Sequence, residues 1–338
     1  MTAPELSIVL PAHNEAATIE LMVATLKSVT AALGLVEIIF VDDGSNDGTL
    51  DALRVAAADP VIRYVSFTRN FGHQEALRAG LHYARGRAVL LMDADFEHPP
   101  ELIPSLVSAW HDGAKVVLTQ RIDDATEVSA MKRLTSTLYY RLLDAIGDVH
   151  IPPGSADFML LDRQVVDLIV GLEGHDIFLR GLVRWLGFPS TTVPFARGKR
   201  LDGSSKFTVR RMVELAITGI AAHSVRPLRI AVWLALAFAT LGLLLVLYSM
   251  VSFFFVPRTV VGWSSIMAAI AILGAAQLLV LGIIGEYVGR ILRETRKRPA
   301  YIVSETEADI RRREMQTAPQ VSVPGRRSPD ASPSATPP

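Results

Sequence analysis

The sequence contains no cysteine, which excludes disulfide bonds and thiolate metal sites. It also has no excess of either charge, because 34 Lys and Arg residues balance 34 Asp and Glu residues. No general electrostatic field therefore favours nucleic acid, and we expect no nucleic-acid partner. The first five residues carry an acid and no base, and the first apolar run ends at Pro11. We therefore expect no cleaved signal peptide.

Charge is also absent from two long internal stretches. The 28 residues between Arg229 and Arg258 have no charged side chain, and neither do the 27 residues between Arg258 and Glu286. Each stretch exceeds the roughly 20 apolar residues that span a bilayer. The alternative, two buried core helices, is disfavoured because such helices are rarely so long and so uniformly apolar. A hydrophobic share of 50% and a mean hydropathy of +0.32 agree with transmembrane helices at 229–257 and 259–286.

Basic residues flank this pair of spans and predict its orientation. Only Arg258 lies in the connecting loop, so the positive-inside rule places both termini, and the domain that precedes the spans, in the cytoplasm, in a multi-pass protein of the inner (plasma) membrane. Residues 206–228 are expected to form interfacial amphipathic helices. Residues 287–316 form a basic cytoplasmic segment, and residues 317–338, with 6 Pro and 4 Ser, are expected to be disordered. The flanking bases are Arg210, Arg211, Arg226, Arg229, Arg290, Arg293, Arg296, Lys297 and Arg298.

Short apolar runs alternate with helical patterns through residues 1–205. Strands are expected at 6–10, 37–41, 61–67, 89–92, 114–119 and 154–161. Helical patterns follow at 16–33, 73–85, 101–110, 127–146, 163–172 and 177–185. Such alternation predicts an α/β domain with a largely parallel sheet.

The acidic pair Asp93 and Asp95 follows the strand expected at 89–92. The pair Pro99-Pro100 then prevents further sheet pairing. Ligands of open α/β sheets bind at the carboxyl ends of the strands. Two carboxylates there suit Mg²⁺ or Mn²⁺ when a diphosphate supplies further oxygen ligands. A solvated turn capped by an Asp is the structural alternative.

Four motifs occur in a fixed order. They are Pro11-x-x-Asn14-Glu15, Asp42-Asp43-Gly44-Ser45-x-Asp47-Gly48-Thr49, Asp93-Ala94-Asp95 and Arg200-x-x-Gly203-x-Ser205-Lys206. Together with the two spans, they resemble the inverting family 2 glycosyltransferases of GT-A fold. Within that family the chain is similar to the polyprenyl-phosphate glycosyltransferases, such as bactoprenol glucosyltransferase and dolichol-phosphate mannose synthase. The resemblance covers residues 6–298 and implies a Rossmann-like GT-A domain, interfacial helices and a two-helix transmembrane hairpin.

The resemblance also implies roles for individual residues. Asp95 would be the direct metal ligand and a catalytic residue, and Asp93 would lie near both the ribose and the metal. Glu97, where relatives often have Gln, is a weaker metal candidate. Nucleotide-binding residues would be Pro11, Asn14, Glu15, Asp42, Asp43 and Asp93.

Asp157 matches the acid proposed as catalytic base in the family. A lipid monophosphate has a second pKa of roughly 6 and is largely a dianion near neutrality, so a base would gain little. A substrate-aligning role for Asp157 and a turn-capping role stay open. Met159 stands where relatives commonly have Arg, which puts one acceptor or sugar contact in doubt. Phosphate and acceptor contacts are implied for Arg121, Arg133, Arg200, Ser205 and Lys206.

The histidines do not follow a zinc-ligand spacing, and we expect loop or core roles for His13, His73, His98, His175 and His223. Arg184-Trp185 resembles part of a processive polysaccharide synthase signature. Gly181, however, occupies its Gln position, which argues against that function.

The expected function is inverting transfer of a glycosyl group from a nucleotide sugar to a polyprenyl phosphate. UDP-glucose is the example donor, and undecaprenyl or decaprenyl phosphate the acceptor. The expected partners are the donor, the lipid acceptor, the membrane and a possible second copy of the chain. The alternatives are transfer to another membrane lipid, or a non-catalytic membrane scaffold or flippase partner.

Overall fold

The computed structural model describes residues 3–122, 152, 154–172, 178–196, 232–233, 235–244, 247–248, 262–296 and 298–309. Three predicted segments lie outside these ranges: the helical stretch at 127–146, the interfacial helices at 206–228 and the tail at 317–338. His175 and His223 also lie outside them.

The described residues form an eight-stranded sheet in the order β7-β5-β6-β4-β1-β2-β3-β8. Its parallel centre consists of β1 (Leu6–Ala12), β2 (Val36–Asp42), β3 (Ile62–Phe67) and β4 (Ala88–Leu91). Nearly every residue of these strands is buried, which explains their continuous rather than alternating apolar pattern. The predicted α/β domain with a mostly parallel sheet is therefore confirmed.

Beyond β4, one strand runs against the direction of the others. β6 (Ser155–Asp162) runs antiparallel to β4 and to β5 (Val116–Ile122), and β7 (Ser190–Ala196) runs parallel to β5. The sequence did not predict β7, because it is a largely exposed edge strand that contains Pro194 and has no apolar run.

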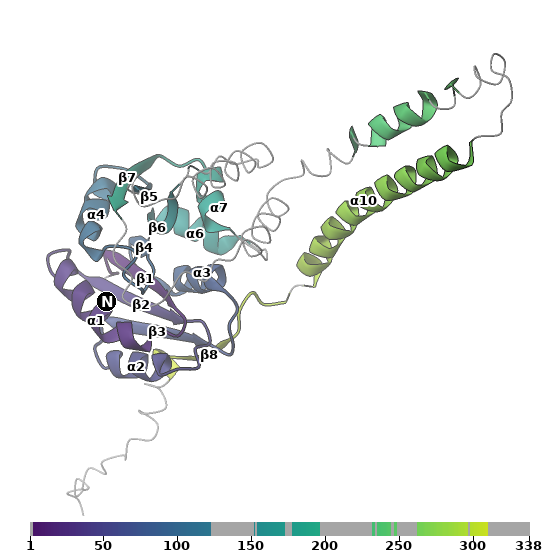
Figure 1. Ribbon diagram of the computed structural model, residues 1–338. Helices are drawn as coiled ribbons and strands as arrows, with labels where there is room; N and C mark the ends of the chain where they lie inside the picture. Colours follow the sequence, from purple (N-terminus) through teal and green to yellow (C-terminus); the bar gives the residue numbers. More distant parts are fainter. Residues whose placement is uncertain are drawn as a thin grey trace, which may run out of the picture.

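Helices cover both faces of the sheet (Figure 1). One face packs against α1 (Ala16–Thr30), α2 (Thr49–Ala56) and α4 (Ile103–His111), the last of which follows the short 3-10 helix η1 (Pro100–Leu102). The other face packs against α3 (His73–Tyr83), α6 (Arg163–Gly171) and α7 (Leu179–Trp185). The buried core therefore has two layers, one on each side of the sheet.

The last strand, β8 (Val303–Thr306), comes from the segment that the sequence assigned to a basic region after the membrane. It pairs antiparallel with β3 and covers the edge of the sheet. Four residues with few apolar side chains give too weak a pattern to be recognised as a strand without the partner strand.

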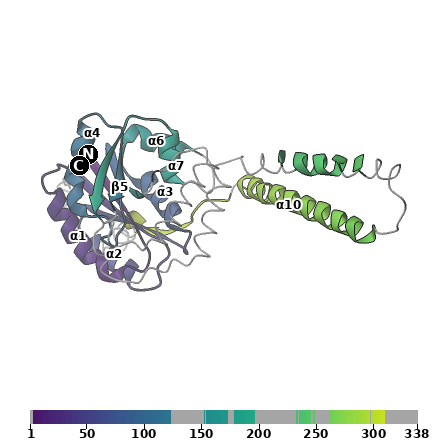
Figure 2. The ribbon, with the colours of Figure 1, turned by 45° about the horizontal axis from the view of Figure 1, so that its top comes forward.

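One long helix, α10 (Trp263–Thr295), projects away from the sheet in both ribbon views (Figures 1 and 2). Its segment Ile272–Gly289 has a mean hydropathy of 1.7 and is not buried against the protein. Within the described ranges this is the one helix long and apolar enough to cross a bilayer, and it overlaps the second predicted span, 259–286. Ala235–Leu244 is a shorter apolar helix inside the first predicted span. The rest of that span lies mostly outside the described residues, so the two-span topology stays a prediction.

Candidate active site

The candidate site lies where β4 ends and β6 begins. Because these strands are antiparallel and pair Leu91 with Met159, the same register continued by two residues places Asp93 opposite Asp157. Arg121 enters the same region from the end of β5. The sheet therefore brings together three of the residues singled out in the sequence.

The Asp93–Pro99 loop takes its shape from His98. The Nδ1 atom of His98 accepts a hydrogen bond of 2.9 Å from the backbone N–H of Asp93. The imidazole stacks on Phe158 at 5.0 Å and lies edge to face with Phe195. Burial lowers the pKa of His98, although Asp93 and Asp95 act in the opposite direction, so the ring is a neutral acceptor at neutral pH. A buried aromatic histidine thus fixes the backbone of the acidic motif.

Two further features hold this loop. Asp95 Oδ1 accepts a 3.0 Å hydrogen bond from the backbone N–H of Glu97. Between them, Phe96 adopts a φ of 64°, a left-handed conformation that is unusual for a bulky side chain. Such a conformation persists where the surroundings impose it, and it is common at functional sites.

Asp157 is the most constrained acid of the site. It is 4% exposed, and Arg180 of α7 binds it bidentately, with Nε to Oδ1 at 2.6 Å and Nη2 to Oδ2 at 2.7 Å. The side-chain amide of Gln74 donates to Oδ2 at 3.2 Å. His73 Nε2 lies 3.5 Å from the same oxygen and 3.6 Å from Asp93 Oδ1, so this ring stands between the two acids.

These contacts determine the charge of Asp157. Burial acts to raise its pKa, but the hydrogen bonds from His73 and Arg180 outweigh burial and hold the pKa of Asp157 well below its usual range. Burial likewise acts to lower the pKa of His73, yet Asp157 and Asp93 raise it. A carboxylate with a depressed pKa is a weak base. The geometry therefore favours an anchoring role for Asp157 over proton abstraction.

The loops after β1 and β2 interlock beside this site. The backbone N–H of Asn14 donates to Ser45 Oγ at 3.0 Å, and Asn14 Oδ1 accepts from the N–H of Asn46 at 3.0 Å. Asn14 adopts a φ of 59° in doing so. The N–H of Glu15 donates to Thr49 Oγ1 at 2.9 Å. Pro11, within β1, is buried below these loops. The first two sequence motifs thus form one structural unit.

Asp42 and Asp43 are buried within that unit. Asp42 accepts from the N–H of Ser45 at 3.0 Å and from Ser66 Oγ at 2.7 Å. Asp43 accepts from the N–H of Phe71 at 2.7 Å and from that of Gly72 at 3.0 Å. Both carboxylates therefore hold loops in place, and their predicted contacts with the nucleotide stay predictions.

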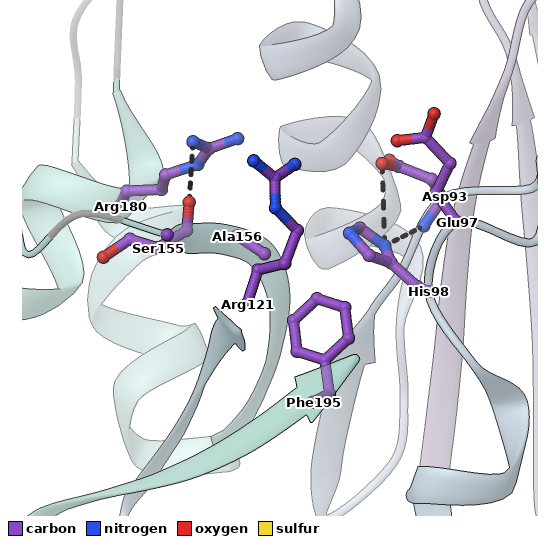
Figure 3. Close-up of a pocket in the computed structure, with 9 residues that line it drawn as sticks. Asp93, Glu97, His98, Arg121, Ser155, Ala156, Arg180 and Phe195 are labelled. Carbon is purple, nitrogen blue, oxygen red and sulfur yellow. Dashed lines mark hydrogen bonds and ion pairs between the residues drawn. The ribbon is translucent and has the colours of Figure 1, made fainter. Parts of the chain in front are cut away.

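A pocket of about 210 Å³ opens at this end of the sheet. Figure 3 shows its two sides: Asp93, Glu97 and His98 lie together, and Arg121 and Arg180 lie across from them. Ser155, Ala156, Gly154 and Phe195 complete the lining. The pocket therefore separates acidic groups from guanidinium groups within a single cavity.

The acidic side suits a divalent cation only in part. Asp93 has a side chain that is 31% exposed and lines the pocket, and Asp95 lies two residues on in the same loop. In the part of the chain that the structure describes, no group of three or more His, Asp or Glu side chains is arranged to hold a metal. Carboxylates are nevertheless the hard ligands that Mg²⁺ and Mn²⁺ accept, and a substrate diphosphate and water commonly complete such a site. The donor set thus fits a metal that is shared with the substrate.

The remaining predicted phosphate contacts, Arg133, Arg200, Ser205 and Lys206, lie outside the described residues. In contrast, the structure adds four residues that the sequence did not single out as functional: His73, Gln74, His98 and Arg180. No short sequence motif could contain these residues together with their partners, because each contacts a residue at least five positions away in the chain. The expectation of a loop or core role holds for His98 but overlooks its bond to the acidic loop.

Comparison with known proteins identifies the family. The sequence profile described as Glycosyl transferase family 2 matches residues 7–169, and that of the GtrB C-terminal hairpin matches residues 226–291. The chain is 38% identical over 302 residues to the uncharacterized glycosyltransferase YkcC of Bacillus subtilis, covering 89% of this chain and 93% of the relative. The chain belongs to glycosyl transferase family 2.

Other relatives are similarly close over most of their length. The bactoprenol glucosyl transferase of Shigella phage SfII is 35% identical over 304 residues, covering 89% of this chain and 98% of the relative. The prophage bactoprenol glucosyl transferase homolog of Escherichia coli K12 is 34% identical over 305 residues, with 90% and 99% covered. The resemblance stated from the motifs is confirmed, and the chain is a glycosyltransferase.

Two solved structures with a bound nucleotide sugar and Mn²⁺ are similar to part of the chain. Glucosyl-3-phosphoglycerate synthase from Mycobacterium tuberculosis, in complex with Mn²⁺ and UDP-glucose, is 24% identical, covers 64% of this chain and 77% of its own, and has a TM-score of 0.45. The mannosyltransferase PcManGT from Pyrobaculum calidifontis, with GDP-Man and Mn²⁺, is 16% identical, covers 85% and 88%, and has a TM-score of 0.47.

Proposed function

We propose that this glycosyltransferase transfers a sugar, with inversion, from a nucleotide sugar to a polyprenyl phosphate at the cytoplasmic face of the membrane. The observation that carries the proposal is the single pocket with acids on one side and arginines on the other. Such a pocket can hold a metal-bound diphosphate and a second phosphate without placing the two anions against each other.

The acidic side is assigned to the donor. Asp93 and Asp95 would hold the cation, with Glu97 as a weaker candidate, and the bound cation would neutralise the diphosphate as the anomeric C–O bond breaks. The interlocked loops at Asn14 and Glu15 lie beside this side and suit the nucleoside, and the buried carboxylates of Asp42 and Asp43 would hold these loops in place for it. Carboxylate and amide oxygens accept from base N–H groups and ribose hydroxyls. UDP-glucose is the donor that we would test first.

The arginine side is assigned to the acceptor phosphate. Arg121 lines it directly, and Arg180 is held against it by Asp157. Near neutral pH a lipid phosphate is largely a dianion, so one of its oxygens can attack the anomeric carbon without prior deprotonation. Asp157, with its depressed pKa, would then orient Arg180 and His73 rather than remove a proton.

The membrane supplies the acceptor in this proposal. The apolar segment Ile272–Gly289 of α10 and the match to the GtrB C-terminal hairpin support an enzyme anchored beside a lipid substrate. The relatives named bactoprenol glucosyl transferases support a polyprenyl phosphate over other lipids.

The test uses the full chain in detergent with Mg²⁺ or Mn²⁺, undecaprenyl phosphate, and a panel of UDP- and GDP-sugars. We expect nucleoside diphosphate release and a glycosylated lipid of the corresponding mass, both lost with EDTA. Asp95→Asn should lower the rate about 100-fold or more while the thermal unfolding temperature stays near that of the wild type. Glu101→Gln, an exposed acid outside the pocket, is the matched control.

Two results would contradict the proposal. If diacylglycerol is glycosylated and the polyprenyl phosphate is not, the acceptor is another lipid. If no donor in the panel is consumed, and Asp95→Asn still supports the protein's cellular function, the chain acts without turnover.

A further inference from the structure

The segment after the membrane helix returns to the catalytic domain and joins its sheet (Figure 1). α10 ends at Thr295, and β8 begins at Val303 beside β3. The backbone N–H of Thr68 donates to the carbonyl of Ile302 at 3.0 Å, which extends the pairing past the end of β3. We call residues 298–309 the return segment.

Two buried or half-buried glutamates fasten the return segment. Glu305 accepts two hydrogen bonds from Arg54, at 2.8 and 2.9 Å, and a third from the Tyr64 hydroxyl at 3.0 Å. Glu307, which is 8% exposed, accepts from Arg63 Nε at 2.9 Å. Arg63 also bonds Glu37 at 2.9 Å inside the domain. Bidentate and buried contacts of this kind fix orientation as well as position.

A row of aromatic rings continues from the return segment toward the candidate donor side. Tyr301 stacks on Phe67 at 4.9 Å with an interplanar angle of 15°. Phe67 meets Phe71 edge to face at 5.7 Å, and the guanidinium of Arg69 lies 4.0 Å over the Phe71 ring. Tyr301 and Phe71 both pack against the same buried cluster.

The row ends in the loop between β3 and α3, at residues 68–72. The N–H groups of Phe71 and Gly72 donate to the carboxylate of Asp43, as described above. Gly72 has a φ of 109°, and α3 begins directly after it with His73, whose ring lies between Asp93 and Asp157. A displacement of Phe71 would therefore disturb both the hydrogen bonds to the Asp43 carboxylate and the start of α3.

We propose that Tyr301 is a positioning residue for the donor site, acting through Phe67 and Phe71 on the 68–72 loop. The segment that follows α10 and the donor site would then be coupled, because Tyr301 would support the 68–72 loop. That loop binds the Asp43 carboxylate and leads into His73. This inference rests on the proposed assignment of the donor side, and the experiment separates the two.

The experiment compares Tyr301→Ala, Tyr301→Leu and Tyr301→Phe in the full chain in detergent. Tyr301→Leu keeps apolar volume without a flat ring, and Tyr301→Phe keeps the stacked ring. Ile302→Ala is the matched control, since the neighbouring side chain is 49% exposed and only its backbone carbonyl binds Thr68. Amide hydrogen exchange is followed in the 68–73 and 303–306 peptides, and Michaelis constants are measured for the nucleotide sugar and for undecaprenyl phosphate.

We expect Tyr301→Ala and Tyr301→Leu to speed exchange of the Phe71 and Gly72 amides at least fivefold. We also expect them to raise the KM for the nucleotide sugar about fivefold, with the KM for the lipid changed less than twofold. Tyr301→Phe and Ile302→Ala should match the wild type in all of these measurements.

The inference is overturned if exchange in the 68–73 peptide stays at the wild-type rate in Tyr301→Leu, or if the two Michaelis constants rise together. The first result would mean that Tyr301 secures only β8. If the wild-type chain consumes no nucleotide sugar, the proposed function fails, whereas the exchange measurement still decides whether Tyr301 supports the loop.

Discussion

At the scale of single residues, the charged partners of Asp157 argue against its acting as a base. The family resemblance alone suggests a base, because sequence position is all that it compares. In the structure, Arg180 occupies both carboxylate oxygens, and His73 and Gln74 contact one of them. A carboxylate that is stabilised in its charged form has little tendency to accept a proton. Asp157 is therefore better suited to holding Arg180 and His73 in place than to acting as a base.

Arg180→Ala should separate this support from general acid–base catalysis. It leaves Asp157 buried without its main cation, so we expect a loss of about 2 kcal/mol in the free energy of unfolding. We also expect the KM for the lipid acceptor to rise more than the KM for the donor. Arg78→Ala is the control, because Arg78 of α3 does not line the pocket and donates to the Leu172 carbonyl at the C-terminal end of α6. Unfolding in denaturant and steady-state kinetics provide the measurements. An unchanged acceptor KM would show that Arg180 does not support the acceptor side.

His98→Phe should test whether the hydrogen bond from the Asp93 N–H to His98 keeps the acidic loop in place. Phenylalanine retains the stacking on Phe158 but cannot accept the hydrogen bond from the Asp93 N–H. Loss of a residue that orients metal ligands commonly weakens metal binding 10- to 100-fold. We therefore expect the Mn²⁺ concentration for half-maximal activity to rise about 10-fold, measured by titration after chelation. His82→Phe on the exposed side of α3 is the control. Equal Mn²⁺ requirements in wild type and His98→Phe would contradict this role.

At the scale of elements, close packing of α3 on the sheet keeps His73 in the site. α3 approaches β1 so closely at Gly80 that an added Cβ would lie 2.0 Å from a methyl carbon of Val9. α3 begins at His73 in the site and then packs across one face of the sheet. A larger separation between α3 and β1 would therefore move His73. A glycine inside a helix lowers helix propensity. Here the lack of a side chain permits the approach.

Gly80→Ala should consequently destabilise the protein in spite of the better helix propensity of alanine. We expect a loss of about 2 kcal/mol from overpacking, measured by chemical denaturation. Adding Val9→Ala removes the clashing methyl groups, so the double variant should be more stable than Gly80→Ala alone. Gly171→Ala, where no atom lies within 4 Å of the added carbon, should stay near the wild type. Additive losses in the double variant would mean that Val9 is not the obstacle.

At the scale of the whole molecule, residues from both ends of the chain build one sheet. β1 lies near its centre, and β8, which follows α10, covers the edge strand β3. An exposed strand edge is prone to pair with other chains. The return segment thus completes the domain as well as connecting it to α10.

A chain that ends after Pro299 should expose the edge of β3 and leave Arg63 without Glu307. We expect its thermal unfolding temperature to fall by about 5 °C or more and its tendency to aggregate to rise. A chain that ends after residue 316 keeps β8 and loses only the Pro-rich tail, so it should unfold at the wild-type temperature. Light scattering and thermal unfolding in detergent distinguish the two. Equal unfolding temperatures would show that β8 adds little to the domain.

The sequence by itself predicted much of the α/β order, the acidic loop after β4 and the apolar segment of α10. These features depend on local patterns: a buried strand needs a continuous apolar run, and a bilayer-spanning helix needs about 20 apolar residues. The family resemblance rested on the same kind of contiguous motif.

The tertiary structure alone decided which groups meet. Arg180 and Asp157 come from different elements, and β8 pairs with β3 although more than 230 positions separate them in the chain. The Asp43 carboxylate accepts hydrogen bonds from the backbone of the 68–72 loop. Local pattern does not record such pairings, because they depend on how the sheet and helices pack and on which buried charge needs a partner. For that reason the sequence pointed to Asp93, Arg121 and Asp157, but it indicated neither the depressed pKa of Asp157 nor the part played by His73, Gln74, His98 and Arg180.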